Sequence, residues 1–208
     1  MTCPGTRKNW KEAETTPKQY RSQRSAFTDP SAEGGEPHIS GYFVVFDQPY
    51  YVWDDMEEVV DPHAFDGCDM SDVRALYNHD ERLVLGRASQ NTSTLTFSVD
   101  STGLYGDIQV NPDDPEAMAA RARILRGDID QASFGFEEND VKYVDLPDGR
   151  VRRIIRGIAK LYEISVCTFP AYEQTSVAAR SGDPAALRRE ITNHKKSNLR
   201  RKLKHHGN

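Results

Sequence analysis

The sequence predicts a mainly β fold with flanking helices, an α+β arrangement, between polar terminal segments. Three observations lead to this prediction. Short runs of β-branched and aromatic residues recur between Gly, Pro, Asn and Asp, as is typical of strands joined by turns. One segment, 111–127, has apolar residues at helical spacing. The two ends, 1–36 and 181–208, carry few apolar side chains, and we expect them to lie outside the folded domain.

The composition is that of a chain with one domain and a modest core. Its 208 residues suffice for one sizeable domain plus tails, with 37% hydrophobic and 28% charged residues. No apolar run is long enough to span a membrane, and the N-terminus lacks the apolar core of a signal peptide, so a cytosolic location is expected. Cys3, Cys68 and Cys167 are odd in number and far apart, which fits neither a disulfide framework nor a zinc site.

Charge is distributed unevenly along the chain. Residues 181–208 hold eight Lys or Arg against two acidic residues, so this tail carries +6 and the remainder −11 of the formal net charge of −5. A basic tail on an acidic body favours contact with an acidic partner, within the chain or outside it. No aromatic residue interleaves the basic ones, so a nucleic-acid partner is not favoured.

The first half of the domain, which is predicted to span 37–180, looks like a series of strands. The residue types predict a strand at 38–46, with a bend at Gly41, and a second extended piece at 50–60. A short helical turn follows at 61–65. A strand at 73–79 comes next, and a meander at 83–87, 94–99 and 103–110 completes this half.

The segment 111–127 is the clearest helix. Asp113 or Asp114 can cap it, Pro115 suits its first turn, and Glu116 complements the helix dipole. Gly127 suits its C-terminal end.

Strands follow the helix, and the first of them carries Ser133. Side chains alternate in a strand, so Ser133 and Gly135 share one face while Ala132, Phe134 and Phe136 share the other. Further strands are predicted at 141–144, 151–161 and 161–167, and a break at 170–172. A weak apolar stripe beyond residue 181 permits a basic helix.

His79, Ser133 and Glu163 lie at or near strand positions and together are the groups needed for nucleophilic acyl transfer. A serine hydroxyl needs a base, and histidine titrates close enough to neutral pH to serve as one. A carboxylate can then fix the tautomer and stabilise the imidazolium. Taken singly, each of the three also fits an ordinary solvent-facing position, and periodicity does not place them together.

Two other kinds of site use neighbouring residues. Asp61, His63, His79 and Asp80 are of ligand types that suit zinc or manganese, but their spacing matches no strong metal-binding pattern, so no metal and no cofactor are predicted. Cys167 shares a strand face with Glu163 and could be a nucleophile, although a buried structural role is favoured.

The chain resembles the prohead (capsid maturation) serine proteases of tailed bacteriophages over about residues 38–180. The family implies an assemblin-like closed β-barrel, related to the herpesvirus assembly proteases, with flanking helices. It also implies a catalytic Ser and His, which fall on Ser133 and His79, while Glu163 is the best match for the third member. The motifs that carry the resemblance are, in chain order, Asp61-Pro62-His63-Ala64-Phe65, Asn78-His79-Asp80, Leu85-Gly86-Arg87, Ala132-Ser133-Phe134-Gly135-Phe136, Tyr162-Glu163-Ile164-Ser165 and Phe169-Pro170-Ala171-Tyr172.

One departure concerns the first motif. The family often has Gly where this chain has His63, so a second histidine lies near the expected site without a family role. If Glu163 is not the third member, Ser165, a water or His63 could take its place, as a second histidine does in the herpesvirus relatives.

The resemblance implies a serine endopeptidase with Ser133 as nucleophile, His79 as general base and acid, and Glu163 orienting the imidazole. The implied substrates are capsid and scaffolding proteins, and the chain itself, cut inside an assembling prohead in the bacterial host cytoplasm. Self-association is a further expected interaction, and a membrane partner is not expected. The alternative is a non-catalytic capsid assembly or scaffolding protein that keeps the protease fold.

Overall fold

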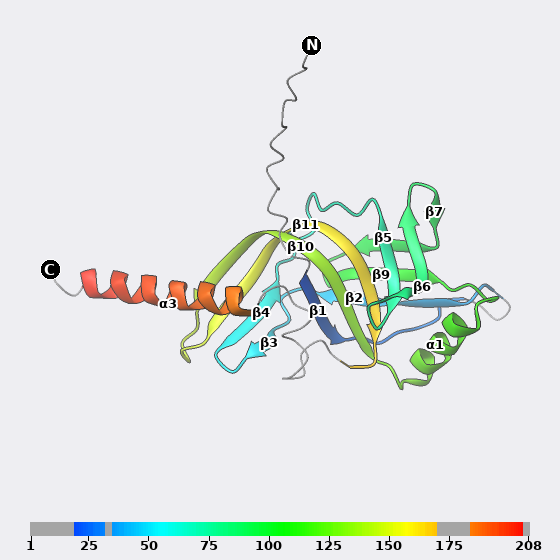
Figure 1. The fold of residues 1–208 in the computed structure, drawn as a ribbon, viewed down its shortest axis with the longest axis horizontal. Coiled ribbons are helices and arrows are strands. Elements are labelled where there is room, and N and C mark those ends of the chain that lie inside the picture. The colour runs from blue at the N-terminus through cyan, green and yellow to red at the C-terminus, as the bar shows by residue number, and fades with distance from the viewer. Residues whose placement is uncertain (1–18, 32–34, 170–183, 206–208) are drawn as a thin grey trace, which may run out of the picture.

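The protein is mainly β with helices at its ends, an α+β arrangement (Figure 1). The computed structural model describes residues 19–31, 35–169 and 184–205. In chain order the elements are β1 (Gln19–Arg24), β2 (His38–Val45), β3 (Tyr50–Trp53), β4 (Met56–Val60), β5 (Val73–Tyr77), β6 (Asp80–Ser89), β7 (Thr92–Ser93), β8 (Leu95–Val99), β9 (Gly103–Gln109), α1 (Pro115–Arg126), β10 (Gln131–Asp145), β11 (Val151–Cys167) and α3 (Pro184–His205).

The strands of the described residues form two sheets. The larger has the order β1-β10-β11-β5-β6-β7, with β4 pairing to β11 and β3 to β4, and the smaller has the order β2-β9-β8. β11 runs parallel to both β4 and β5 and antiparallel to β10. Among the described residues neither sheet closes on itself through backbone hydrogen bonds. The strand pairing therefore does not confirm the predicted closed barrel.

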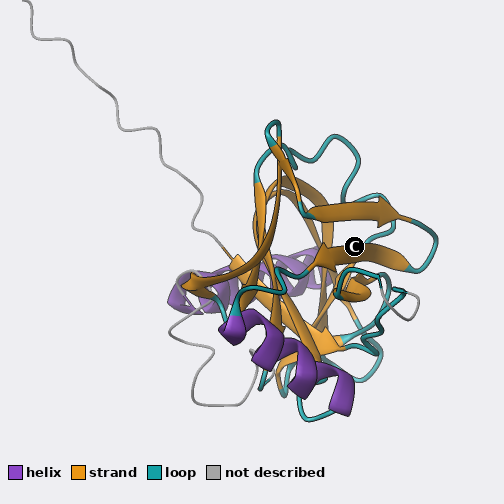
Figure 2. Cartoon of the chain, turned by 90° about the vertical axis from the view of Figure 1, so that its right-hand side faces the viewer, coloured by secondary structure: helices purple, strands orange, loops and turns teal. Residues whose placement is uncertain are grey.

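One hydrophobic cluster fills the space that both sheets and α1 enclose. α1 lies nearest the viewer in Figure 2, with the strands behind it, and buries Ala117, Ala120 and Ile124. The predicted helix is confirmed: Asp114 is its N-cap and accepts hydrogen bonds from two backbone amides, and Gly127 ends it in the left-handed conformation at φ 88°.

β10 and β11 are longer and more continuous than the sequence predicts. Breaks are predicted between 136 and 141 and at 161, but each strand runs through these points. The register between the two strands shifts at several places, including Gly135/Phe136 and Asp140/Val141. Such β-bulges let a strand bend without ending. Because each bulge adds an unpaired residue, it interrupts the alternation of apolar and polar residues, and one bent strand is predicted as two.

β1 corrects the prediction for part of the N-terminal segment. Residues 19–24 belong to the stretch expected to lie outside the domain, yet they pair antiparallel with β10 along their whole length. The buried side chains of β1 are polar. Gln23 accepts a hydrogen bond from the backbone amide of Val45 at 2.8 Å and donates one to the carbonyl of Tyr42 at 3.3 Å. A segment held by such bonds shows no apolar pattern in the sequence.

Arg21, also on β1, belongs to a buried charge cluster with Glu58, Arg153 and Glu138. Its guanidinium contacts both carboxylate oxygens of Glu58, with Nη2 to Oε2 at 2.9 Å, and Arg153 Nη1 reaches Oε2 at 2.6 Å. Arg153 also contacts Glu138. Burial alone would raise the pKa of Glu58, but the two guanidinium groups hold that pKa below its usual value. The cluster ties β1, β4, β10 and β11 together.

α3 lies in the predicted basic tail, and its first half contacts the domain. Ile191 is buried with Met56 and Val151. Arg188 stacks over the ring of Trp53 at 4.0 Å from the centroid. Arg188 and Lys195 both bind the carboxylate of Asp55 at 3.0 Å. This part of the tail was expected to lie outside the domain, and for these basic residues the acidic partner is within the chain.

We predict that Arg21→Ala destabilises the protein by about 3–5 kcal/mol, because it leaves the buried carboxylate of Glu58 with one guanidinium fewer. Arg24→Ala is the matched control, since Arg24 lies on the same strand with a largely exposed side chain. We expect it to change the free energy of unfolding little. Urea unfolding of the two variants measures the difference, and equal effects would show that the cluster does not hold β1.

The same cluster predicts how stability depends on pH. The pKa of Glu58 is lowered in the folded protein. Its contribution is therefore complete above the unfolded-state pKa of about 4.3 and is lost as pH falls through the folded-state pKa. Urea unfolding across this acidic range should show a smaller loss of stability in Glu58→Gln than in the wild-type chain. A parallel loss in both would assign the acid sensitivity to other carboxylates.

Candidate active site

Ser133 lies on β10 between two other serines. Ser22 of β1 stands directly opposite Ser133 on one side, and Ser165 of β11 stands opposite it on the other. Directly opposite residues in antiparallel strands project to the same face, so the three hydroxyls form a row across the sheet. All three residues are buried, and Ser133 Oγ has no hydrogen-bond partner among the described residues.

The other face of β10 is apolar, as the sequence predicts. Ala132, Phe134 and Phe136 are fully buried in the main core. The rings of Phe134 and Phe136 stack with their centroids 4.8 Å apart. Gly135 pairs with Glu163, so no side chain of β10 stands opposite that carboxylate. The strand is therefore anchored through one face and presents Ser133 on the other.

His79 lies in a tight turn, although the sequence predicts that it ends the strand at 73–79. β5 ends at Tyr77, which pairs with Asp80 across the turn. Asn78 and His79 have φ of 53° and 60°. A two-residue hairpin turn with positive φ at both positions is of type I′, in which Asn is favoured. His is also more frequent than most residues in this left-handed region.

Asn78 fixes the position of this turn against the end of β11. Its backbone amide donates to the carbonyl of Val166 at 2.9 Å. Its side-chain oxygen accepts a hydrogen bond from the amide of Thr168 at 2.8 Å, and its side-chain nitrogen donates to Thr168 Oγ1 at 3.1 Å. In the sequence Asn78 stands out only as a member of the Asn78-His79-Asp80 motif, although Asn at the end of a strand is also a turn signal.

The structure brings His79 and Glu163 into contact. His79 Nδ1 and Glu163 Oε1 are 2.7 Å apart, and both side chains are largely buried. Ser165 Oγ donates to the second carboxylate oxygen, Oε2, at 2.5 Å. Because an ionised carboxylate only accepts hydrogen bonds, Nδ1 is the donor of this bond, and Nε2 carries the lone pair in the neutral tautomer. The sequence names Ser165 only as a possible substitute for Glu163, and its contact with Glu163 is a feature of the folded structure.

The other predicted candidates lie elsewhere or have other contacts. His63 is exposed, with Nδ1 3.1 Å from Asp66. Asp61 accepts a hydrogen bond from the backbone amide of His63, and Asp80 pairs with Arg82 at 2.7 Å. In the described part of the chain, no group of three or more His, Cys, Asp or Glu residues is arranged to hold a metal ion. Cys167 is buried at the end of β11.

A histidine held by a carboxylate, in a sheet that presents a buried serine, is the set of groups that acyl-transfer hydrolases use. Within the described residues, no helix is both long and apolar enough to cross a membrane.

Comparison with known proteins identifies the family. The model of the caudovirus prohead serine protease family matches residues 24–196. The prohead protease of Enterobacteria phage HK97 is 30% identical over 168 residues, which cover 78% of this chain and 69% of that protein. The capsid assembly protease of bacteriophage T4 has a structure that matches with a TM-score of 0.44 and 14% identity, over 75% of this chain and 98% of that one. This chain belongs to the caudovirus prohead protease family.

Membership of this family makes the chain a capsid maturation protease and favours that function over a purely structural role in assembly. The resemblance that the sequence motifs indicate is thereby confirmed.

We predict that Asn78 stabilises the turn in two separable ways. Asn78→Gly keeps the left-handed backbone but loses the side-chain bonds to Thr168, at a cost of about 1–2 kcal/mol. Asn78→Ala adds the strain of a positive φ, about 1–2 kcal/mol more. Asn91→Ala, in the turn between β6 and β7 where no positive φ occurs, is the control. Urea unfolding measures the free energy of unfolding of each variant. Equal values for Asn78→Gly and Asn78→Ala would show that the positive φ at residue 78 adds no strain.

Proposed function

We propose that the chain is a serine endopeptidase in which Ser133 is the nucleophile, His79 the general base and acid, and Glu163 the group that orients the imidazole. The observation that carries the proposal is the 2.7 Å contact between His79 Nδ1 and Glu163 Oε1. It orients the ring with Nδ1 toward the carboxylate, so that Nε2 is the nitrogen that would exchange a proton with Ser133.

The reaction would proceed through an acyl-enzyme. As Ser133 Oγ attacks the scissile carbonyl carbon, its proton passes to His79 Nε2. The imidazolium then gives that proton to the leaving amine as the peptide C–N bond breaks. A water repeats the sequence on the ester, and its proton goes to Nε2 and then back to Ser133 Oγ. Glu163 stays ionised throughout and stabilises the imidazolium.

Ser165 would be a positioning residue in this scheme. Its hydroxyl holds Oε2 of Glu163 while His79 binds Oε1, so both carboxylate oxygens are engaged. A buried carboxylate with fixed partners does not need to reorient when the imidazolium forms, and preorganisation of this kind lowers the barrier. Ser133 is fully buried, so a movement that exposes its Oγ must precede substrate binding.

The family supports capsid and scaffolding proteins as the substrates, together with the chain itself. We place the activity inside the assembling prohead, in the host cytoplasm. There the local concentration of substrate is high, and a protease meets neighbouring copies of its own chain as readily as other proteins.

We also propose that the two sheets form a closed barrel of the assemblin type. Two contacts between the sheets support this. Thr28, just beyond β1, forms a β-bridge with Ser40 of β2. At the other side the amide of Arg87 in β6 donates to Oγ1 of Thr94, the residue just before β8, at 3.0 Å. The single core that both sheets share is also what a barrel interior requires.

We predict that Glu163→Gln lowers the rate of peptide cleavage by up to about 10⁴-fold, because the amide keeps the shape but loses the charge that supports the imidazolium. Ser165→Ala should cost less, since it removes one hydrogen bond of about 1–3 kcal/mol. Glu137→Gln, at a carboxylate that accepts from Tyr162 at 2.9 Å, is the control and should keep full activity. Unchanged cleavage by Glu163→Gln would remove Glu163 from the site.

We predict that the overproduced wild-type chain shortens itself, whereas Ser133→Ala accumulates at full length. His79→Ala should behave like Ser133→Ala, because loss of either member nearly silences a unit of this kind. Ser98→Ala, at an exposed serine on β8, and Cys167→Ser are controls that should still be processed. Intact-mass spectrometry reads out all five samples. Self-trimming by Ser133→Ala in a host without other candidate proteases would contradict a serine mechanism.

A further inference from the structure

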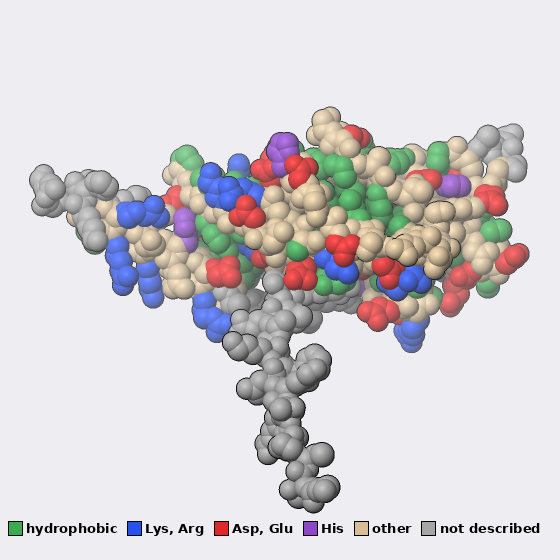
Figure 3. Space-filling view, turned by 90° about the horizontal axis from the view of Figure 1, so that it is seen from above, with side chains coloured by type: hydrophobic (Ala, Val, Ile, Leu, Met, Phe, Trp, Pro, Cys, Tyr) green, Lys and Arg blue, Asp and Glu red, His purple; other side chains and the backbone are tan. Residues whose placement is uncertain are grey.

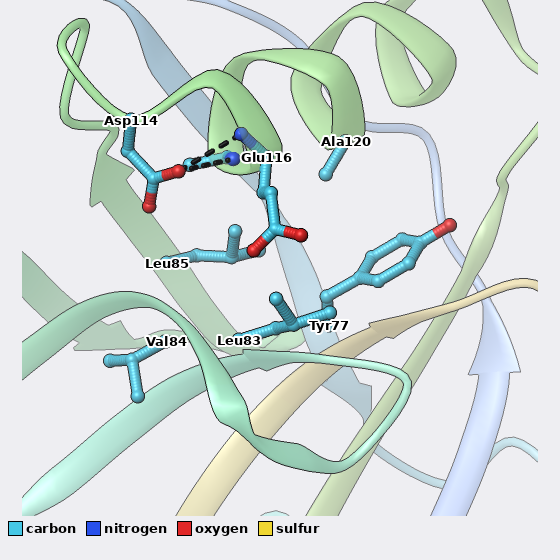
Figure 4. Close-up of a pocket in the computed structure, with 8 residues that line it drawn as sticks. Tyr77, Leu83, Val84, Leu85, Asp114, Glu116 and Ala120 are labelled. Carbon is cyan, nitrogen blue, oxygen red and sulfur yellow. Dashed lines mark hydrogen bonds between the residues drawn. The ribbon is translucent and has the colours of Figure 1, made fainter.

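An apolar groove with acidic edges runs along β6. Its larger part, of about 430 Å³, lies between β6 and the segment 109–112, with Glu36 at its mouth. Its smaller part lies between β6 and the first turns of α1, and both parts share Val84 and Leu85. Figure 4 shows Glu116 of α1 reaching toward Leu83 and Leu85 in the smaller part. We call the two parts together the β6 groove. Val84, which lines both parts, is 42% exposed, a large value for an apolar side chain.

The distal half of α3 has complementary features. Leu199 is 58% exposed and Leu203 is 66% exposed. Four residues apart, they lie on one face of the helix. Lys196 lies three residues before Leu199 and Arg200 directly follows it. α3 as a whole holds eight Lys or Arg against one acidic residue, Glu190. Among the described residues, Asn198 is the last of α3 whose side chain hydrogen-bonds to the domain, through Asp145 at 2.7 Å.

These two surfaces lie at opposite ends of the molecule. In Figure 1 α3 projects from one end, while β6 and α1 form the other. Figure 3 shows the same separation of charge, with Lys and Arg gathered over α3 and acidic side chains frequent at the opposite end. A helix cannot reach across its own domain to the groove, so an interaction between them must join two copies.

We propose that the distal half of α3 from one copy docks in the β6 groove of a second copy. Leu199 and Leu203 would cover the apolar floor around Val84, and the basic side chains beside them would meet Glu36 and Glu116. Arg82 lies near Glu116, but it is paired with Asp80 and so does not leave an uncompensated positive charge at the groove. Pairing of two α3 helices with each other is disfavoured, because it would bring their basic side chains together.

This contact joins two different surfaces, so it is heterologous and either closes into a ring or extends as a chain of copies. It would also place α3 of one copy beside the active-site hairpin of the next, because Tyr77 lines the groove and lies two residues before His79. The proposal concerns association alone and does not depend on the assignment of Ser133 as nucleophile.

The test uses full-length protein with Ser133→Ala in every sample, so that self-cleavage cannot change the mass. The helix variant carries Leu199→Gln and Leu203→Gln, which keep helix propensity, and its groove is intact. The groove variant carries Val84→Lys, and its helix is intact. Val99→Lys, at a similarly exposed valine on β8, is the control. Sedimentation velocity after nuclease treatment measures the state of association at low and high salt.

We expect the protein and the Val99→Lys control to associate with rising concentration, and high salt to weaken this association. Each of the other two variants alone should associate at least about tenfold more weakly. Their mixture should form a one-to-one dimer and nothing larger, because only one intact helix and one intact groove can meet. The proposal is overturned if the protein stays monomeric at every soluble concentration or if nuclease abolishes association. It is also overturned if either variant alone associates as strongly as the protein, or if the mixture does not pair.

Discussion

The parallel pairing of β5 with β11 is the constraint on which the active site depends. Glu163 pairs with Arg74 and Val166 with Tyr77, so β5 ends level with the C-terminal part of β11. The chain must reverse there within two residues, and the left-handed turn at Asn78 and His79 allows it. This reversal brings the imidazole to the Glu163 carboxylate. A shift of one residue in this pairing would turn the side chains of β5 to the opposite face, and Val73 and Ala75 would leave the core.

Much of this site follows from the sequence, and the remainder does not. The alternation around Ser133 predicts its face correctly, because Ala132, Phe134 and Phe136 form an apolar row that must be buried. His79 is predicted on a strand because its apolar neighbours continue the alternation up to Tyr77. The positive φ of a non-glycine residue leaves little trace in a sequence. The serine row across β1, β10 and β11 depends on strand register, which local patterns do not give.

In the rest of the fold, elements with local sequence features are predicted, and an element whose buried side chains are polar is missed. The helix α1 is predicted closely, because its cap, its first-turn proline and its terminal glycine are local features. β1 is missed, because its buried side chains are held by charge and hydrogen bonds. The buried side chain of Arg21 forms an ion pair with Glu58, and that of Gln23 hydrogen-bonds to the backbone of β2. Only the three-dimensional arrangement shows that Arg21 and Gln23 of this polar segment have partners in the interior.

The position of β1 also limits how a substrate can approach Ser133. β10 pairs with β1 on one side and with β11 on the other at this residue, so neither of its edges is free there. While β1 stays in place, a substrate cannot add to β10 as a further strand, which is a common way for proteins to bind extended peptides. For Ser133 to act as proposed, the scissile carbonyl therefore has to come over the face of the sheet where Ser22, Ser133 and Ser165 project. Gly135 lies on the same face two residues beyond Ser133 and adds no side chain there, whereas Phe134 and Phe136 project into the core.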